Sequence, residues 1–311
     1  MSAPAELVTA PQTGKPSRPR PETDVAGLGR ARASVFVAPA LVLIGIFLVF
    51  PALWTLYLGL LKYSLSGTSA EAPSFVGFGN YTSALSDPTF RESLLKTLIY
   101  VIFSAAIGQN LLGFTIAWYS RSAPSWVRGV LTVLVLVAWI LPSSVVAFLW
   151  QALLDRQDGI LNLLLHTTGT AWTLDHPMIV IVVFNIWRGA AFSMLLYSSA
   201  LNVVPTSHLE VTRLAGATKL QQLRDVVLPH IKGHVLTNSL LITLWTFNDF
   251  TPYLITGGGP NGNSETLPVY IYKTALEGGQ LGYGSAISLL LLLANLVIAV
   301  IYIRALRRLP A

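Results

Sequence analysis

Residues 285–303 read SAISLLLLLANLVIAVIYI and carry no charge. A helix needs about 20 mostly apolar residues to cross roughly 30 Å of hydrocarbon, so this stretch is long enough to span a membrane. Its leucine run at 289–293 is apolar on every side, as is the run at 133–137. A membrane-spanning strand would instead alternate polar and apolar residues over about 10 positions. The pattern therefore predicts a transmembrane helix.

Five further stretches meet the same test, each with at most one charge and with charged or turn-forming residues at its ends. The six predicted spans are 34–61, 94–119, 126–151, 178–201, 235–255 and 285–303. The expected fold class is an all-α integral membrane protein with six transmembrane helices. Its membrane domain covers residues 34–307 and follows a disordered cytoplasmic tail, residues 1–33, that does not read as a signal peptide.

The composition of the 311-residue chain agrees with this assignment. Hydrophobic residues make up 53% and charged residues 11%, and no cysteine is present. A soluble domain carries about 25% charged residues, more than twice this share. A disulfide scaffold, thiol chemistry and a disordered protein are excluded, and a soluble enzyme is nearly excluded.

Basic residues set the expected orientation. With the amino terminus inside, fourteen Lys and Arg residues fall on cytoplasmic segments and five on outer segments or span edges. Cytoplasmic loops of membrane proteins carry such an excess. We therefore expect a multi-pass protein of the prokaryotic cell (inner) membrane, surrounded by lipid, with both termini cytoplasmic. The net charge of +6 is a topology signal and predicts no nucleic-acid partner.

The sequence offers no set of residues for catalysis or metal binding at membrane depth. All five histidines fall in loops or at span ends, and no G-x-x-x-x-G-K-[ST] phosphate loop is present. Gly257-Gly258-Gly259-Pro260 lacks the following lysine and lies on the outer side of the predicted topology. We expect no enzyme, no metal and no cofactor on this chain, so uphill transport would need another subunit or an ion gradient.

The loop between the fourth and fifth spans, residues 205–229, is the most informative segment. Ser207 to Glu210 has the spacing of a capping box that starts a short helix. Gly216-Ala217 predicts a turn, and a second short helix ends at Leu228-Pro229. Taken alone, this pattern equally fits an amphipathic helix on the inner leaflet with Glu210 as a cap.

The frame Glu210, Gly216-Ala217 and Leu228-Pro229 resembles the E-A-A…G-A…L-P loop of permease subunits of ABC importers, with Val211 and Thr212 in place of the two alanines. Two further stretches resemble the sugar-importing permeases of malto-oligosaccharides, disaccharides and glycerol phosphate: Phe78-Gly-Asn-Tyr81 and the outer loop 254–275. The resemblance covers the chain from about residue 34 to its end and implies the permease fold of type I ABC importers.

In that family the loop forms coupling helices that sit in a cleft of the ATPase. The resemblance thus assigns ATPase coupling to Glu210, Leu214, Gly216, Ala217, Leu228 and Pro229. It also implies four partners: a second permease in a heterodimer, two cytoplasmic ATPase subunits that hold ATP and Mg²⁺, and an extracytoplasmic sugar-binding protein.

Arg188 and Asp249 are ionisable groups inside the fourth and fifth spans, and both are predicted in the outer half of the membrane. Such residues are rare and usually face a partner or a cavity. One interpretation is an ion pair that joins the two helices. The other is a substrate path for a sugar, whose hydroxyls bind planar polar groups and whose ring stacks on aromatic side chains. The candidate path residues are Trp187, Arg188, Gly189, Trp245, Thr246, Asn248 and Asp249.

The leading hypothesis is a permease subunit that moves a sugar by alternating access after an external binding protein delivers it. A permease for a non-sugar solute is one alternative. An ion-coupled secondary transporter is another, but it predicts inverted repeats, which these spans do not show, and more carboxylates at membrane depth than Asp249.

Overall fold

The computed structural model describes residues 30–167 and 169–308. The chain divides into two compact units, residues 1–53 and 54–311. In the first, helix α1 (Arg30–Ile44) continues through the π-helical segment η1 (Gly45–Val49) into α2 (Phe50–Gly59), whose end belongs to the second unit. Helix α1 starts at Arg30, inside the predicted tail of residues 1–33, and the rest of that tail lies outside the described residues.

The second unit holds the remaining described elements. In chain order these are β1 (Leu61–Lys62), α3 (Thr68–Glu71), β2 (Ser74–Phe75), α4 (Gly79–Ser86), α5 (Pro88–Tyr100), η2 (Val101–Gln109), α6 (Asn110–Ser120), α7 (Ser125–Ile140), α8 (Ser143–Leu153), α9 (Ile160–Leu165), α10 (Trp172–Asp175), α11 (Pro177–Asn202), α12 (Thr206–Leu214), α13 (Lys219–Gln222), η3 (Leu223–Val227), α14 (Leu228–Phe247), α15 (Thr251–Thr256), η4 (Pro260–Gly262), α16 (Leu267–Tyr272), η5 (Lys273–Glu277) and α17 (Leu281–Arg307).

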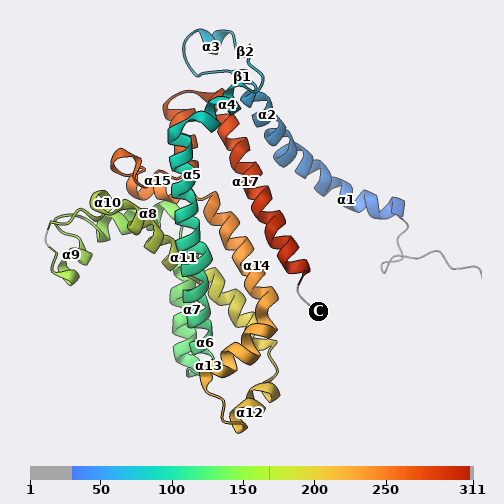
Figure 1. The fold of residues 1–311 in the computed structure, drawn as a ribbon, viewed down its shortest axis with the longest axis vertical. Coiled ribbons are helices and arrows are strands. Elements are labelled where there is room, and N and C mark those ends of the chain that lie inside the picture. Colours follow the sequence, from blue (N-terminus) through green and yellow to red (C-terminus); the bar gives the residue numbers. More distant parts are fainter. Residues whose placement is uncertain (1–29, 168, 309–311) are drawn as a thin grey trace, which may run out of the picture. The chain divides into compact units, whose positions relative to one another are not determined.

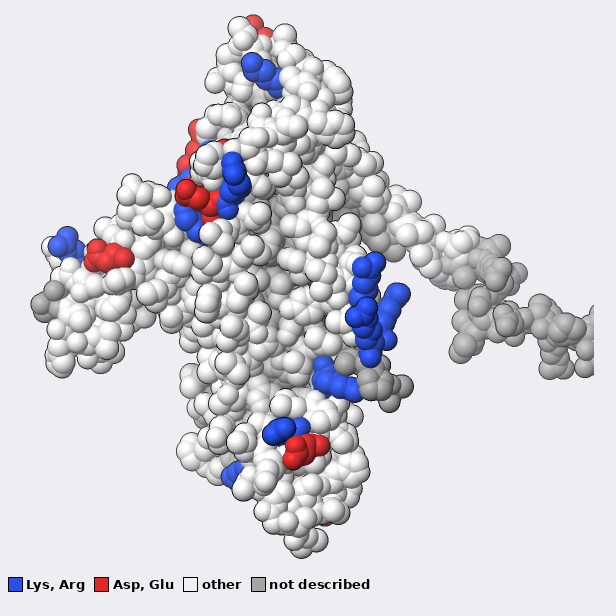
Figure 2. Space-filling model, viewed as in Figure 1, with Lys and Arg blue, Asp and Glu red and all other residues white. Residues whose placement is uncertain are grey.

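Long helices form the body of this unit. In Figure 1, α5, α6, α11, α14 and α17 run alongside one another, with α12 and α13 at one end and the β1–β2 hairpin and α4 at the other. The hairpin is a two-stranded antiparallel ladder in which Leu61 faces Phe75. In the face drawn in Figure 2, charged side chains gather in a few separate groups, and broad uncharged surface lies between them. This distribution suits helices that cross a lipid bilayer.

Among the described residues, four helical segments are long and apolar enough to cross a membrane by themselves: Ser34–Gly59, Pro88–Ser120, Pro177–Asn202 and Leu281–Arg307. They correspond to the first, second, fourth and sixth predicted spans. The third and fifth predicted spans are not single straight helices.

The third predicted span, 126–151, is bent by 105° between α7 and α8. Leu141 and Pro142 have extended backbone angles, with ψ of 139° and 140°. Proline lacks an amide hydrogen, and its ring disfavours a helical conformation of the residue before it. The third predicted span is therefore a bent pair, in which Pro142 ends α7 and α8 starts in a new direction.

The fifth predicted span, 235–255, is interrupted where the polar residues lie. Helix α14 ends at Phe247, and α15 begins at Thr251. Asp249 Oδ1 accepts a hydrogen bond from the Thr251 amide at 2.9 Å and so satisfies one amide at the start of α15. Short polar side chains that bind nearby backbone groups compete with helical hydrogen bonding. The break is thus built from the same residues that were predicted to line a path.

Three apolar clusters hold the helices of the second unit together. One joins α6 and α11 to η3 and α14 around Tyr197 and Val227, and a second joins α4 and α5 to α16 and α17 around Phe90 and Ile287. The third packs α8 against α11 and α15 around Phe184. Helix α11 takes part in two of the clusters, so it links the loop region at one end to the broken helix near the other.

Candidate functional site

A cavity of about 200 Å³ lies beside the break between α14 and α15. Its lining comes from η2, α7, α11, α14 and the break itself: Gln109, Trp139, Asn185, Arg188, Gly189, Ile242, Trp245, Thr246 and Asp249. Five of the seven predicted path residues are among them. The structure thus brings the polar groups of the fourth and fifth predicted spans to one small cavity.

Asp249 is held by neutral donors on both of its oxygens. The Tyr100 hydroxyl donates to Oδ2 at 2.8 Å, and the Thr251 amide and hydroxyl donate to Oδ1 at 2.9 and 2.6 Å. Thr251 is only 4% exposed. The carboxylate is therefore fixed in place by α5 and by the first turn of α15.

Arg188 has a different environment. No carboxylate among the described residues lies within ion-pairing distance of its guanidinium, and Thr251 Oγ1, at 3.5 Å, is the one hydrogen-bond acceptor that these residues offer it. A guanidinium carries five N–H donors, so most of them are left for a ligand or water. The predicted alternative of a direct Arg188–Asp249 ion pair is not formed, since Thr251 stands between the two side chains.

Gly189 of α11 lets the Gln109 side chain, which lines the neighbouring wall of the cavity, approach α11 closely. A Cβ atom at this position would lie 2.1 Å from Cδ of Gln109. Gln109 Nε2 donates to the Asn185 carbonyl at 3.0 Å, and Asn185 Nδ2 donates to Ser104 Oγ at 2.7 Å and to Thr246 Oγ1 at 3.1 Å. A polar network of neutral groups therefore continues from η2 across α11 to α14.

Two predicted path residues do not line the cavity. Trp187 packs on Trp150, with ring centroids 5.7 Å apart. The Asn248 amide pairs with Asn295 of α17 through two hydrogen bonds of 3.0 and 3.2 Å. Trp245 does line the cavity, and its ring contacts Phe192 edge to face at 4.6 Å.

The turn predicted at Gly216-Ala217 ends helix α12. Gly216 has φ of +79°, its amide binds the Arg213 carbonyl at 3.0 Å, and the Ala217 amide binds the Thr212 carbonyl at 2.9 Å. These two bonds and the left-handed residue are the Schellman motif, which favours glycine. No heavy atom lies within 4 Å of a Cβ built on Gly216, so the chain itself leaves this point open.

Helices α12 and α13 bury one face and expose another. Leu209 of α12 lies in the apolar cluster around Tyr197, together with Val226 and Val227 of the adjoining segment η3, whereas Leu214 is 90% and Leu220 73% exposed. Glu210 is also exposed, and it lines a hollow of about 280 Å³ that includes Arg213.

Two local predictions for this loop were wrong. Helix α12 already begins at Thr206, after Pro205, with no side-chain cap, so Ser207 and Glu210 lie inside its first turns and form no capping box. The capping box is instead made by Thr218 and Gln221 at the start of α13.

Leu228-Pro229 does not end a helix either. The π-helical segment η3 runs directly into α14, and Pro229 occupies the first turn of α14. Proline cannot supply the amide that would bond to the preceding turn, and the wider π-helical turn of η3 lies immediately before it.

The family of binding-protein-dependent transport system inner membrane components matches residues 109–309. The chain belongs to this family. The match includes α6, α11, the α12–α13 loop and the broken α14–α15 pair. The permease is therefore a transport component of the inner membrane, and the ion-coupled alternative is no longer needed.

Known relatives of the permease span most of its length. It is 26% identical to the sulfoquinovosyl glycerol transport system permease SmoG of Agrobacterium fabrum, over 89% of this chain and 91% of that protein. It is also 26% identical to the trehalose/maltose transport system permease MalF of Thermococcus litoralis, over 87% and 92% of the two chains.

One solved structure, a bacterial ABC transporter that imports the acidic polysaccharide alginate, contains a chain that superposes with a TM-score of 0.72. The match covers 90% of the permease and 96% of that chain at 18% sequence identity. The likeness confirms the predicted all-α fold of the type I ABC importer permeases.

Several cavity residues of the permease escaped the sequence analysis. Gln109, Asn185, Tyr100 and Thr251 each line the cavity or hold Asp249. They are neutral polar residues inside or next to apolar stretches, which was a usable signal. Attention to the charged residues of the spans left these neutral polar residues out.

Proposed function

We propose that the permease moves a carbohydrate through the cavity beside the α14–α15 break. The observation that carries this proposal is the contrast between Asp249, whose two oxygens both accept hydrogen bonds from neutral donors, and Arg188, whose donors are largely free. A guanidinium that lines a cavity at membrane depth without a counter-ion is costly unless it serves a ligand or faces water.

Carbohydrate is the favoured cargo for two reasons. Arg188, Thr246 and Gln109 offer hydrogen-bonding groups, and Trp139 and Trp245 offer apolar faces around the same cavity. In addition, the names of the relatives and of the structural neighbour refer to sulfoquinovosyl glycerol, trehalose, maltose and alginate, which are all carbohydrates or carbohydrate derivatives.

Within this proposal the residues have different roles. Arg188 donates hydrogen bonds to sugar oxygens. Gly189, which has no side chain, leaves room for the Gln109 side chain. Asp249 acts as a positioning residue that holds Tyr100 and Thr251 and thereby keeps α14 broken. Trp187 and Asn248 support the helices next to the cavity.

The energy for import enters through partner subunits. The exposed apolar residues of α12, above all Leu214, supply area for a docked protein, and Glu210 is free to meet a basic residue. Two cytoplasmic ATPase subunits that hold ATP and Mg²⁺ fit this role, since the chain carries no phosphate loop and no catalytic set of its own. Both termini are then cytoplasmic.

Two more partners complete the proposed importer. A binding protein delivers the sugar on the outer side, and a second, different permease supplies the other half of the pathway. Alternating access follows because α11 and α14 flank both the α12–α13 loop and the cavity, so a movement of the loop is transmitted to the cavity walls.

The test is a charge swap, Arg188→Asp with Asp249→Arg, in the assembled transporter reconstituted in proteoliposomes. We expect no recovery of ATP-driven uptake, because Asp249 binds Tyr100 and Thr251 and forms no ion pair with Arg188. Recovery by the swap would mean that the two charges only pair, and would overturn the assignment.

Because the double variant can fail to assemble, Arg188→Lys is the companion variant. It keeps the charge but loses the planar fork, so it should assemble normally and import with a raised KM. Unchanged uptake by this variant would also contradict a direct contact with sugar.

A further inference from the structure

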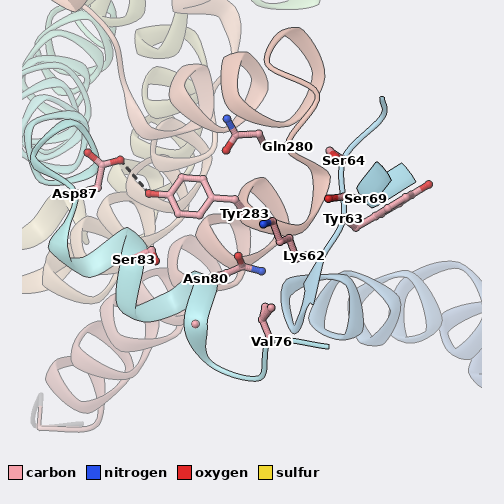
Figure 3. Close-up of a pocket in the computed structure, with 11 residues that line it drawn as sticks. Lys62, Tyr63, Ser64, Ser69, Val76, Asn80, Ser83, Asp87, Gln280 and Tyr283 are labelled. Atoms are coloured by element: carbon pink, nitrogen blue, oxygen red, sulfur yellow. Dashed lines mark hydrogen bonds between the residues drawn. The ribbon is translucent and has the colours of Figure 1, made fainter. Parts of the chain in front are cut away.

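A second cavity, of about 620 Å³, lies at the end of the second unit where the β1–β2 hairpin meets α4 and the start of α17. It shares no lining residue with the membrane cavity. Its volume falls within the range of roughly 300–1,000 Å³ typical of small-molecule sites. Figure 3 shows its lining residues coming from separate segments of the chain.

The walls of this outer cavity are tied together by direct hydrogen bonds. Asn80 Nδ2 donates to the Gly59 and Leu61 carbonyls at 2.9 and 2.8 Å, which fixes α4 to the hairpin. The Gly282 amide donates to the Tyr63 carbonyl at 2.9 Å, which fixes the hairpin to α17. A Cβ at Gly282 would lie 2.1 Å from the Leu61 carbonyl oxygen, so α17 approaches the hairpin as closely as a glycine permits.

Asp87 fixes the opposite wall. Its Oδ2 accepts hydrogen bonds from the hydroxyls of Tyr270 at 2.7 Å and Tyr283 at 2.9 Å, the latter drawn as a dashed line in Figure 3, and its Oδ1 accepts one from the Thr89 amide at 2.8 Å. Partial burial raises the pKa of Asp87, but these hydrogen bonds outweigh it and hold the pKa below the usual range. The carboxylate therefore stays charged and holds the Tyr283 ring at the cavity wall.

The remaining lining offers groups that suit a hydroxyl-rich ligand. Lys62, Ser83 and Gln280 are exposed polar side chains, and Asn80 Oδ1 is an acceptor on the cavity wall. Val76 and the Tyr283 ring supply apolar surface, against which the C–H face of a sugar ring can pack. One cation, Lys62, and one anion, Asp87, line the cavity, so its charges balance and favour a neutral ligand.

Two helices connect this cavity to the membrane cavity. Asp87 caps the start of α5, and Tyr100 at the end of α5 holds Asp249. Helix α5 has thirteen residues, so Asp87 and Tyr100 lie about 20 Å apart along its axis at 1.5 Å per residue. Tyr283 likewise lies near the start of α17, whose Asn295 pairs with Asn248 beside the break.

We propose that the outer cavity is a second carbohydrate site, which holds a neutral mono- or disaccharide before it enters the membrane cavity. The choice of ligand rests on the carbohydrate cargo proposed above, and the site itself rests on the geometry of the hairpin, α4, Asp87 and α17. A binding protein that simply covers this hollow with a side chain is the competing occupant, and the experiment separates the two.

The chain contains no cysteine, so a single introduced cysteine is the one thiol of this chain that can be labelled. Ser83→Cys puts the thiol in the cavity, and Thr82→Cys, next to it on α4 but outside the lining, is the matched control. The assembled transporter in nanodiscs is treated with N-ethylmaleimide, with and without maltose, trehalose, sucrose or glucose. Labelling of this chain is measured by intact mass.

We expect at least one of these sugars to slow labelling of Ser83→Cys, by roughly tenfold when the sugar is at about ten times its dissociation constant. Thr82→Cys should label at the same rate with and without sugar. In the Ser83→Cys background, Lys62→Ala or Gln280→Ala should weaken protection, and both residues are exposed and so should not disturb folding.

Two outcomes would overturn the proposal: no protection by any of the four sugars, or protection by the sugar-free binding protein alone. ATP-driven uptake measured on the same variants keeps the two proposals apart. Normal uptake with an unprotected Ser83→Cys would reject the outer site and leave the proposed transport function standing.

Discussion

The membrane cavity and the α12–α13 loop differ in which side chains they enclose and which they expose. Around the cavity, polar side chains such as Asn185 and Asp249 are enclosed and bound by groups of the same chain. On α12 and α13, large apolar side chains such as Leu214 and Leu220 are exposed. A lone chain leaves apolar area in water only at some cost, which supports the proposal that another subunit docks on this face.

The contrast separates two kinds of residue. Cavity residues such as Asn185 and Asp249 have their partners within this chain, so changing them should alter stability and transport together. Those on the exposed face of α12 have their partner elsewhere, so changing them should alter transport alone. The predictions below test that separation, from the largest expected effect to the smallest.

Leu214→Asp should abolish coupling while leaving the chain folded. Leu214 is 90% exposed, so its loss costs this chain little, but a charge buried against a docked subunit costs several kcal/mol, and each 1.4 kcal/mol is tenfold in affinity. We expect ATP-driven uptake to fall by about 100-fold or more. Leu214→Met is the control, because it keeps the apolar area.

Thermal unfolding of the two Leu214 variants should be the same when this chain is measured without ATPase subunits. A lower melting temperature for Leu214→Asp alone would mean that the exposed face is stabilised within this chain, and the contrast would fail.

Asn110→Leu should destabilise the helix bundle. Its Oδ1 accepts hydrogen bonds from Tyr197, Asn238 and Ser239, which join α6 to α11 and α14. Removing the acceptor leaves buried donors unpaired at roughly 1–3 kcal/mol each, so we expect a loss of about 3 kcal/mol. Denaturant or thermal unfolding measures it.

The control for Asn110 is Leu111→Ala, one residue along the same helix, where the side chain is 63% exposed. This change should cost much less. If both variants unfold at the same midpoint, the hydrogen-bonded group around Asn110 adds nothing to stability.

Gly216→Ala should lower coupling by straining the end of α12. A φ of +79° disfavours any residue with a Cβ, by about 1 kcal/mol, although open space surrounds the position. We expect a several-fold loss of uptake per ATP hydrolysed. Gly129→Ala in α7 is the control, since that position is also open but has ordinary helical backbone angles. Equal behaviour of the two variants would show that the left-handed turn has no functional role.

Tyr270→Phe should change how the stability of the folded chain depends on pH in the acidic range. The pKa of Asp87 is lower in the folded chain, so its contribution to stability is fully present above the unfolded pKa of about 3.9 and is lost as the pH falls through the folded value. Removing one donor brings the folded pKa closer to the unfolded value, so the loss of stability in acid should be smaller and should be complete at a higher pH. The effect is below about 1 kcal/mol, because Asp87 is partly exposed.

Melting temperatures measured across this acidic range test the prediction. Tyr119→Phe serves as the control because Tyr119 is 68% exposed and far from Asp87 in the sequence. An identical pH profile for wild type and Tyr270→Phe would contradict the role given to the Asp87 hydrogen bonds.

Apolar length and the spacing of a few residues predicted much of this molecule. Four spans correspond to helices, and the turn at Gly216 and the grouping of Arg188 with Thr246 and Asp249 are present. These features depend on local chemistry. Apolar runs need lipid, a left-handed turn needs glycine, and intramembrane charges need a cavity or a partner.

Other features were not predicted in detail. The bend at Pro142 and the break at Asn248–Phe250 lie within apolar sequence, where proline and short polar residues are compatible with either a kink or a straight helix. The missing Arg188–Asp249 pair results from Tyr100 and Thr251, which reach Asp249 from other elements. The spacing of these residues in the sequence does not indicate which donor will bind Asp249.

The central claim is that the cavity beside the α14–α15 break carries sugar under the control of the α12–α13 loop. Its most direct test is the amount of sugar imported per ATP hydrolysed by the full transporter in proteoliposomes, compared between wild type and Arg188→Met. The account predicts that the variant still hydrolyses ATP when the loaded binding protein is added but imports far less sugar per ATP. An unchanged ratio would contradict it.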